Sequence, residues 1–374
     1  MKKIVVISDS FKGTLSSREI CEIARGAAAR ILPGCKLDAI PAADGGEGTV
    51  DCFLASSGAQ PVTVCVSGPF GEKENAIYAR KGTLAVVETA SAAGFSSAHR
   101  DPSAATTFGV GELIRHAVGH GCTEILLGLG GSCTNDGGCG CAAAMGTRFT
   151  DSSGEEFVPV GGTLDRIAHI DVSQTRQLLD GVTVTLMSDV DNPLCGEFGA
   201  ARVFGPQKGA DAETAARLDA NLGILAARIE SELGISVADV PGAGAAGGMG
   251  AGCMAFLGAR MRSGIETVLD SIGFDALLDG AELVITGEGR VDGQSAGGKL
   301  ISGVARRTRR RGIPLVAIAG CIMPDAAALY DLGVTAMFGI DREARDLEDY
   351  APRSAELYRA TLEDVLRFAA ATIN

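Results

Sequence analysis

The chain has 374 residues, 46% of them hydrophobic, and is therefore long enough for two folded domains with large cores. Its 33 basic and 46 acidic residues give a formal net charge of −13, which argues against nucleic acid as a partner because phosphate backbones are bound by basic surfaces. No apolar run is long enough for a membrane span or a signal peptide, and the 11 cysteines include no C-x-x-C pair, so we expect a cytoplasmic protein with structural thiols and no membrane partner.

The start of the chain alternates between strand and helix patterns. The expected elements are a strand at 3–8, a helix at 17–31, a strand within 35–41 and a helix at about 49–57. Ser16 and Glu19 have the spacing of a capping box, which marks the beginning of the first helix. This β-α-β-α order is typical of a parallel sheet.

The loops that follow these two strands contain Lys12 and Asp44. Lys12 stands between a strand end and a helix N-terminus, a position that suits an anion, although a structural lysine fits this fragment equally well. Asp44 is a candidate for orienting a substrate, and its alternative role is a hydrogen bond to its own turn.

The pattern changes after residue 60. Three β-rich segments, 61–67, 75–81 and 83–89, follow one another across short turns and predict antiparallel hairpins. The elements expected after them are helices at 104–120, 137–146, 211–233 and 249–262 and strands at 125–129 and 182–189. This part of the chain therefore predicts a mixed α/β domain.

Two polar loops in this part of the chain contain candidate site residues. Asn135 lies in the segment SCTNDGG and is a candidate for binding a substrate, or it serves the turn itself. Asp189 and Asp191 form an Asp-x-Asp pair at the expected end of the strand at 182–189. In an extended stretch both carboxylates point to the same side, where they can hold Mg²⁺ or one of them can accept a proton. A plain turn remains the alternative.

A glycine-rich segment, GAGAAGGMGAG at 242–252, precedes the expected helix at 249–262. Its backbone N–H groups, for example near Gly244, Gly247 and Gly248, can cradle a nucleotide. The glycine spacing also resembles a dinucleotide fingerprint, but no convincing strand precedes it.

Near the C-terminal end, the strand expected at 283–286 leads into a glycine-rich loop that contains Glu288, Arg290, Asp292 and Lys299. The spacing from Gly293 to Lys299 approaches that of a P-loop, but Leu300 replaces the Ser or Thr that binds Mg²⁺. We therefore predict a phosphate-facing loop with Lys299 as a phosphate contact. The remaining elements are expected at 299–311, 313–320, 334–340 and 353–371.

The predicted fold class is α/β, with a Rossmann-like parallel-sheet domain that is interrupted by a second, mixed α/β domain. Residues 1–60 and 281–374 form the first domain, and residues 61–280 form the inserted one. The active site is expected in the cleft between the two domains, because loops at strand ends carry the charged residues.

Seven segments in this order resemble the bacterial glycerate kinase family of the glycerate 2-kinase type. They are DSFKGTLSS, PAADGGEGT, GLGGSCTNDGG, DVDNPLCG, VFGPQKGA, GAGAAGGMGAG and ITGEGRVDGQSAGGK, from residue 9 to residue 299. The resemblance implies transfer of a phosphoryl group from ATP, with Mg²⁺, to D-glycerate as the small-molecule partner, with 2-phospho-D-glycerate as the product. It leaves a homo-oligomer open.

The resemblance also suggests roles for the charged residues. Arg290 is expected to grip the carboxylate of glycerate, and Asp292 or Asp189 to accept the hydroxyl proton. Two carboxylates, Asp191 and Glu288, are metal candidates. The remaining assignments are Lys12 as a catalytic residue, Lys208, Lys299, Gly244, Gly247 and Gly248 as contacts of ATP, and Asp44 and Asn135 as contacts of the substrate.

Other functions stay open at this point. Phosphorylation at the 3-position, a kinase for another small hydroxy acid, an NAD-dependent dehydrogenase and a non-catalytic sensor of small acids also fit some of these patterns. The dehydrogenase lacks a clean dinucleotide fingerprint, and the sensor does not need so many acidic loop residues.

Overall fold

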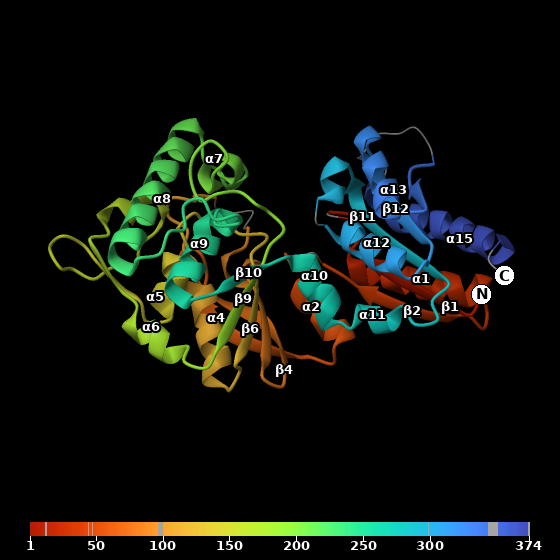
Figure 1. Cartoon of the computed structure of the whole chain (residues 1–374), viewed down its shortest axis with the longest axis horizontal. Coiled ribbons are helices and arrows are strands. Elements are labelled where there is room, and N and C mark those ends of the chain that lie inside the picture. Colours follow the sequence, from red (N-terminus) through yellow and green to blue (C-terminus); the bar gives the residue numbers. More distant parts are fainter. Residues whose placement is uncertain are drawn as a thin grey trace. The chain divides into compact units, whose positions relative to one another are not determined.

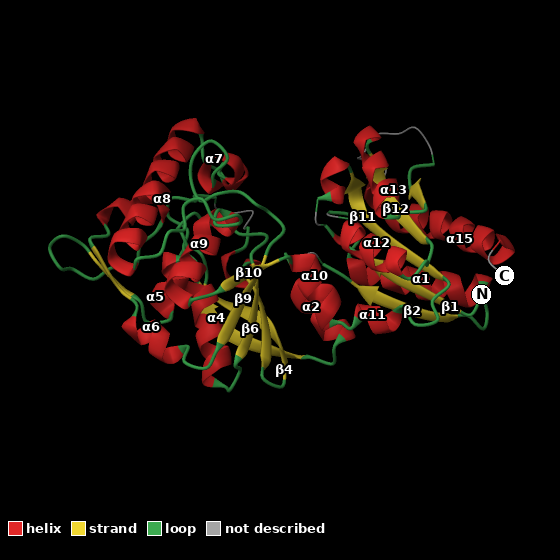
Figure 2. Cartoon of the chain, in the orientation of Figure 1, coloured by secondary structure: helices red, strands yellow, loops and turns green. Residues whose placement is uncertain are grey.

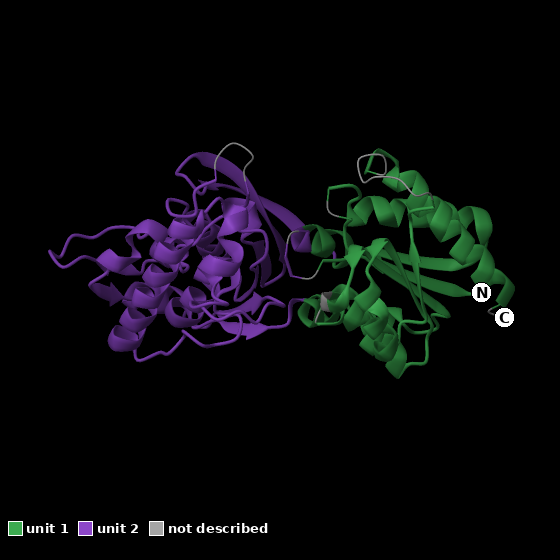
Figure 3. Cartoon of the chain, turned by 90° about the horizontal axis from the view of Figure 1, so that it is seen from above, with its two compact units in different colours: residues 1–44, 51–57, 265–374 green, residues 45–50, 58–264 purple. Residues whose placement is uncertain are grey.

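The computed structural model describes residues 1–11, 13–43, 45–46, 48–95, 100–297, 299–342 and 351–372. It separates into two compact units (Figure 3). Unit 1 contains residues 1–44, 51–57 and 265–374, and unit 2 contains residues 45–50 and 58–264. The chain thus changes units at 44/45, 50/51, 57/58 and 264/265, whereas the domain division proposed from the sequence has its boundaries at 60/61 and 280/281.

Unit 1 is built on a parallel sheet of five strands in the order β13-β12-β11-β1-β2 (Figure 1). The strands are β1 (Lys3–Ser8), β2 (Lys36–Pro41), β11 (Leu283–Val291), β12 (Leu315–Ile322) and β13 (Ala336–Gly339). β1 pairs with β2 on one side and with β11 on the other. The parallel, Rossmann-like arrangement predicted from the two ends of the chain is confirmed.

Unit 1 also contains helices. They are α1 (Ser17–Ile31), α2 (Thr49–Ser56), α10 (Gly264–Ser271), α11 (Phe274–Leu277), α12 (Leu300–Arg310), α13 (Ala328–Leu332) and α15 (Ser354–Thr372), with short 3₁₀ turns η3 (Gly293–Ala296), η4 (Pro324–Ala327) and η5 (Ala351–Arg353). Of these helices, α1, α12 and α15 pack on the sheet. The capping box between Ser16 and Glu19 is present at the start of α1. Ile4 and Val6 of β1 share one core with α1 and α15, and their alternation fits a strand with two covered faces.

Unit 2 contains a mixed sheet of six strands in the order β10-β9-β6-β5-β4-β3 (Figure 2). The strands are β3 (Gln60–Ser67), β4 (Lys73–Lys81), β5 (Leu84–Glu88), β6 (Glu124–Gly128), β9 (Thr183–Met187) and β10 (Arg260–Arg262). β3, β4 and β5 are antiparallel neighbours, as the hairpin pattern predicts, whereas β5, β6, β9 and β10 run parallel. A separate antiparallel pair consists of β7 (Arg148–Thr150) and β8 (His169–Asp171).

One core holds the helices of unit 2 against this sheet. They are α3 (Ala90–Ala93), α4 (Phe108–Gly119), α5 (Cys139–Ala144), α6 (Ser173–Leu178), α7 (Ala200–Phe204), α8 (Ala212–Leu233) and α9 (Ala245–Leu257), with η1 (Gly161–Arg166) and η2 (Pro206–Lys208). All 11 cysteines are free. No helix in the described part of the chain is long and apolar enough to cross a membrane.

Two expectations about elements are wrong. β11 continues to Val291 instead of ending at 286, because Gly287 lets the backbones of β11 and β12 come close; an added Cβ would lie 2.1 Å from the Ile318 carbonyl oxygen. The helix expected to reach 262 ends at Leu257, since Gly258 adopts a left-handed φ of +66°, and residues 260–262 form β10 instead.

Candidate functional site

In unit 1 the chain leaves the sheet after β2 and returns in β11 on the opposite side of β1. Open parallel sheets bind ligands at such a reversal, outside the carboxyl ends of the two strands. The end of β1 is tied to β11 there: Ser8 Oγ and the Asp9 N–H donate to the Gly287 carbonyl oxygen at 2.9 and 3.0 Å. The first residues after β1 therefore lie beside the charged end of β11.

Glu288 and Arg290 both belong to β11, so their side chains point to the same side of the sheet. Glu288 is buried and Arg290 is largely exposed. The guanidinium Nε of Arg290 lies 3.3 Å from the Asp292 carboxylate. Lys299 stands at the N-cap position of α12, where backbone N–H groups favour an anion. The structure therefore places Glu288, Arg290 and Asp292 together at the end of β11, and Lys299 at the start of the next helix, α12.

Lys12 and Asp44 lie outside the described residues. Asp9 is a further acidic residue in this part that the sequence did not single out. It is buried, and its Oδ1 accepts a hydrogen bond of 2.6 Å from the Ser10 N–H. Its place directly after a buried strand would have indicated it.

In unit 2 the parallel strands β5, β6, β9 and β10 end at one edge of the sheet. Asp189 lies just after β9, and its Oδ1 accepts hydrogen bonds from Ser263 Oγ at 2.8 Å and the Gly264 N–H at 3.0 Å. Asp191 is exposed. Asp189 therefore anchors the segment that follows β10, in addition to any role in catalysis.

Glu88, the last residue of β5, is a buried carboxylate that the sequence reasoning missed. Its Oε1 accepts a hydrogen bond of 2.6 Å from the Val50 N–H, in the first turn of α2. In the sequence, a charged residue at the end of an otherwise apolar strand would have indicated Glu88 as a candidate. The contact ties Val50 to the sheet of unit 2.

A buried lysine of η2 contacts the loop after β6. Lys208 is only 3% exposed, and its Nζ donates to Ser132 Oγ at 2.9 Å and to the Thr134 carbonyl oxygen at 2.7 Å. Burial lowers the pKa of the Lys208 ammonium to about 8, and the charge of Asp136 counters part of that shift. The structure therefore places the Lys208 ammonium on the main chain of the residue before Asn135, although 73 positions separate Lys208 from Asn135 in the sequence.

Asn135 and its neighbours differ in how their polar atoms are satisfied. Neither Asn135 Oδ1 nor Nδ2 has a hydrogen-bond partner, and the same holds for Thr134 Oγ1, although all three atoms are buried. Asp136, in contrast, accepts hydrogen bonds from the main chain and hydroxyl of Thr107 and from two glycine N–H groups. Burial raises the pKa of the Asp136 carboxyl, and these donors counter the shift. Asp136 is thus a structural anchor of the loop.

The glycine-rich segment packs directly on protein backbone. A Cβ at Gly244 would lie 2.3 Å from the Pro193 carbonyl oxygen, and one at Gly247 would lie 2.0 Å from that of Thr134. Gly248, with a φ of +89°, would meet Gly137 Cα at 3.0 Å. Ala246 also has a positive φ, +54°. These close approaches require glycine, and they place Gly247 against the loop that carries Asn135.

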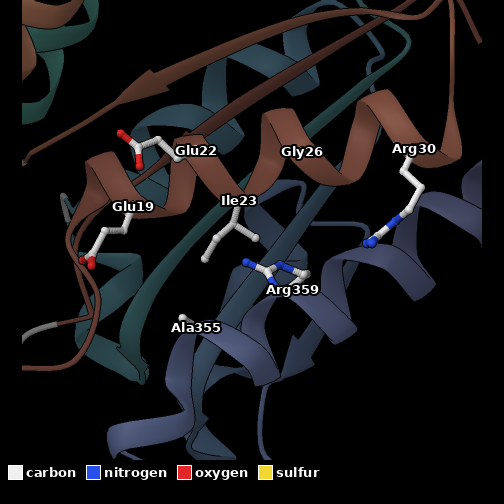
Figure 4. A pocket seen from close by; sticks show the side chains of 7 residues that line it. All are labelled: Glu19, Glu22, Ile23, Gly26, Arg30, Ala355 and Arg359. Carbon is white, nitrogen blue, oxygen red and sulfur yellow. The ribbon is translucent and has the colours of Figure 1, made fainter.

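A groove of about 400 Å³ lies elsewhere, between α1 and α15 of unit 1 (Figure 4). Its lining includes Glu19, Glu22, Arg30 and Arg359. Arg30 is paired with Glu363. None of the predicted site residues lines this groove, and its mixed charges do not favour one ligand.

Comparison with known proteins agrees with the motif pattern. Residues 4–370 match the model of the glycerate kinase family. The chain is 42% identical to a glycerate kinase of Bacillus cereus (strain ATCC 10987 / NRS 248), covering 97% of each chain. It is 40% identical to the glycerate 2-kinase of Escherichia coli (strain K12), covering 98% of this chain and 100% of that protein.

A solved structure supports the same relationship. A crystal structure from Salmonella typhimurium LT2, provisionally named glycerate kinase 2, superimposes with a TM-score of 0.86 at 40% sequence identity. The superposition covers 99% of this chain and 98% of the other. At this identity and coverage, both units have the fold of that protein.

Proposed function

Since the chain belongs to the glycerate kinase family, we propose that it transfers the terminal phosphoryl group of ATP to D-glycerate and forms 2-phospho-D-glycerate. The family match over residues 4–370 carries this proposal, because it includes all the charged motif segments of both units. The relative named glycerate 2-kinase favours the 2-position over the 3-position.

Phosphoryl transfer needs cations at the phosphates, a base or orienting group at the attacking hydroxyl, and an enclosed site. In unit 1 we assign Lys12 and Lys299 to the phosphates and Arg290 to an oxyanion of a reactant. Asp292 and Asp189 are the candidate bases. Lys208 supplies a cation in unit 2, and Gly244, Gly247 and Gly248 are the proposed backbone contacts of ATP. That the reaction takes place in a cleft between the two domains also stays a prediction.

Mg²⁺ in phosphotransferases is held by one or two carboxylates together with phosphates and waters. Asp191 and Glu288 offer oxygen ligands of this kind, and we propose them as the metal contacts. No group of three or more His, Cys, Asp or Glu side chains in the described residues is arranged to hold a metal. The donors therefore fit an ion bound jointly with nucleotide phosphates, whose charge it would neutralise.

The proposed setting is the cytoplasm, where 11 free cysteines remain reduced. Small-molecule reactants, D-glycerate and ATP, are the proposed partners, with Asp44 and Asn135 as further substrate contacts. A homo-oligomer remains compatible with this function.

The proposal is tested with the purified chain, Mg²⁺, ATP and D-glycerate. ADP release that depends on D-glycerate, measured by a discontinuous assay, supports the kinase. A change in NADH absorbance with D-glycerate and NAD⁺ in the absence of ATP would instead indicate a dehydrogenase. Binding of D-glycerate without either reaction would indicate a sensor.

A further inference from the structure

The loop after β6 holds buried polar atoms whose hydrogen bonds are not satisfied within the protein. Asn135 has no exposed surface, yet its amide oxygen and its amide nitrogen both lack partners. The same is true of the hydroxyl of Thr134. Buried polar groups are almost always hydrogen-bonded, since leaving one unpaired is costly. The loop therefore offers both a donor and an acceptor to a group that the protein does not supply.

Lys208 brings a positive charge to the same loop. Its ammonium donates to the carbonyl oxygen of Thr134 and to Ser132 Oγ. An ammonium carries three donors, and two of them are used here. Because Lys208 is only 3% exposed, water screens its positive charge little, and the charge acts strongly on the loop.

The unpaired donors and acceptors of this loop determine which groups a ligand must carry to bind there. An anion satisfies the ammonium and the N–H donors of the amide, but a fully ionised phosphate group is only an acceptor and would leave Asn135 Oδ1 unpaired. A carboxylate with a nearby hydroxyl satisfies all of them, because the hydroxyl can donate to Oδ1. D-Glycerate has this combination, and the hydroxyl at C2 must stay free for phosphorylation.

We propose that Asn135, Thr134 and Lys208 form the acceptor subsite, in which Lys208 and Thr134 bind the carboxylate and Asn135 Oδ1 accepts a hydrogen bond from the C3 hydroxyl. This inference rests on the proposed function and deepens it. In this assignment Lys208 binds the acid instead of the nucleotide, and Arg290 binds the transferring phosphoryl group. Holding the C3 hydroxyl in this way directs the phosphoryl group to C2.

Access to the subsite requires a movement of the backbone that packs on it. Gly247 lies against the Thr134 carbonyl oxygen and Asn135 Cα, and its own carbonyl oxygen accepts a hydrogen bond from the Gly137 N–H at 3.1 Å. The preceding residue, Ala246, is the only non-glycine residue with a positive φ in the described part of the chain. Strain of this kind occurs at sites that change conformation. The segment 244–248 is therefore the part that opens.

The test compares D-glycerate with D-lactate, which has a methyl group in place of the C3 hydroxymethyl group. The readout is the ratio of the Ki of D-lactate, as a competitor of D-glycerate, to the KM of D-glycerate. We expect a ratio of about 10 to 100 for the wild type, since lactate leaves Asn135 unpaired. Asn135→Leu should bring the ratio close to 1 and leave the KM of ATP unchanged.

Asn135→Asp keeps the acceptor oxygen but replaces the NH₂ group by a second oxygen that repels the acid. It should raise both the KM of D-glycerate and the Ki of D-lactate by about 10-fold or more while keeping their ratio. Asn221→Leu is the matched control, because Asn221 is a buried amide of unit 2 whose Nδ2 is already bonded to the Gly161 carbonyl oxygen at 2.8 Å. It should leave the ratio at the wild-type value.

The outcomes separate this inference from the proposed function. If the wild type releases no ADP with D-glycerate, the proposed function fails. If the wild type is active but Asn135→Leu keeps the ratio, or raises the KM of ATP instead, the acceptor subsite is overturned. Should Asn135→Leu fail to fold, an unchanged KM of D-glycerate in Asn135→Asp overturns it equally.

Discussion

Lys208 donates a hydrogen bond of 2.7 Å from its buried ammonium to the main-chain oxygen of Thr134. No partner of opposite charge lies within salt-bridge distance of this lysine in the described structure, so the charge is held mainly by neutral oxygens. A buried ammonium of this kind is costly to the folded protein and suited to an incoming anion.

The first prediction concerns the pH dependence of this site. Burial lowers the pKa of Lys208 from 10.5 to about 8, so the ammonium is lost as the pH rises through about 8. We expect kcat/KM for D-glycerate to fall above that pH. Lys208→Arg keeps its charge, because a guanidinium does not titrate in this range, so any activity it retains should not show this fall. The same fall in Lys208→Arg would contradict the role of Lys208.

The lowered pKa of Lys208 also predicts how the stability of the protein depends on pH. The unfolded lysine binds its proton up to about pH 10.5 whereas the folded one loses it at about 8, so the unfolded state binds more protons between these values. The Lys208 contribution to the unfolding free energy should therefore rise with pH from about 8 to 10.5. Denaturant unfolding of wild type and Lys208→Met measures it, and a difference between them that does not depend on pH would contradict the shift.

The third prediction tests the candidate bases. Removing the group that accepts the hydroxyl proton should lower kcat by about 10²–10⁴-fold, so Asp292→Asn and Asp189→Asn are compared at saturating substrates. Ser263→Ala serves as the control for Asp189, because it removes one hydrogen bond to that carboxylate and retains the carboxylate itself. Full activity of the double variant Asp189→Asn, Asp292→Asn would exclude both residues as the base.

The fourth prediction concerns the ion cluster that joins α10, α11 and α12. Arg307 is 7% exposed and pairs with Glu266, Asp270 and Asp275 at 2.7 to 2.9 Å. Arg307→Met should lower the unfolding free energy by about 2 kcal/mol, below the usual cost of breaking a buried pair because the carboxylate side chains are 35 to 59% exposed.

This loss should depend on pH. Burial raises the pKa of Glu266, but hydrogen bonds from Arg307 and Arg306 outweigh that effect and keep it below 4.5. The stabilisation is therefore fully present above pH 4.5 and disappears as the pH falls through the lower, folded-state pKa. A difference between wild type and Arg307→Met that stays constant down to pH 2 would contradict this account.

The fifth prediction concerns the strained segment over the loop. Ala246→Gly should raise the unfolding free energy by about 1 kcal/mol, because glycine adopts a positive φ without the steric cost that alanine has. Ala245→Gly is the matched control and should be destabilising, since Ala245 is buried and has no positive φ. Gly247→Ala should destabilise most, as its Cβ would lie 2.0 Å from the Thr134 oxygen. Equal melting temperatures for the three variants would contradict the strain.

The sequence predicted those parts of the fold that depend on local patterns. The capping box of α1, the hairpins from β3 to β5 and the parallel strands of unit 1 all follow from periodicity and turn residues. The length of β11 was missed because glycines usually mark a loop, and here they allow two strands to approach. Only the neighbouring strand, 31 positions further on in the chain, explains them.

For the candidate site, too, local patterns were predictable from the sequence and contacts between distant segments were not. Glu288, Arg290 and Asp292 were found because they follow an expected strand within one local segment. The sequence could not show that Lys208 reaches the loop of Asn135, or that the amide of Asn135 has no partner, since both depend on contacts between distant segments.

The most direct measurement is a proton-coupled ³¹P NMR spectrum of the product made from D-glycerate and Mg-ATP. A phosphate at C2 couples to the single proton on that carbon and gives a doublet, whereas a phosphate at C3 couples to two protons and gives a triplet. We predict the doublet of 2-phospho-D-glycerate. A triplet, or no phosphorylated glycerate at all, would contradict the account.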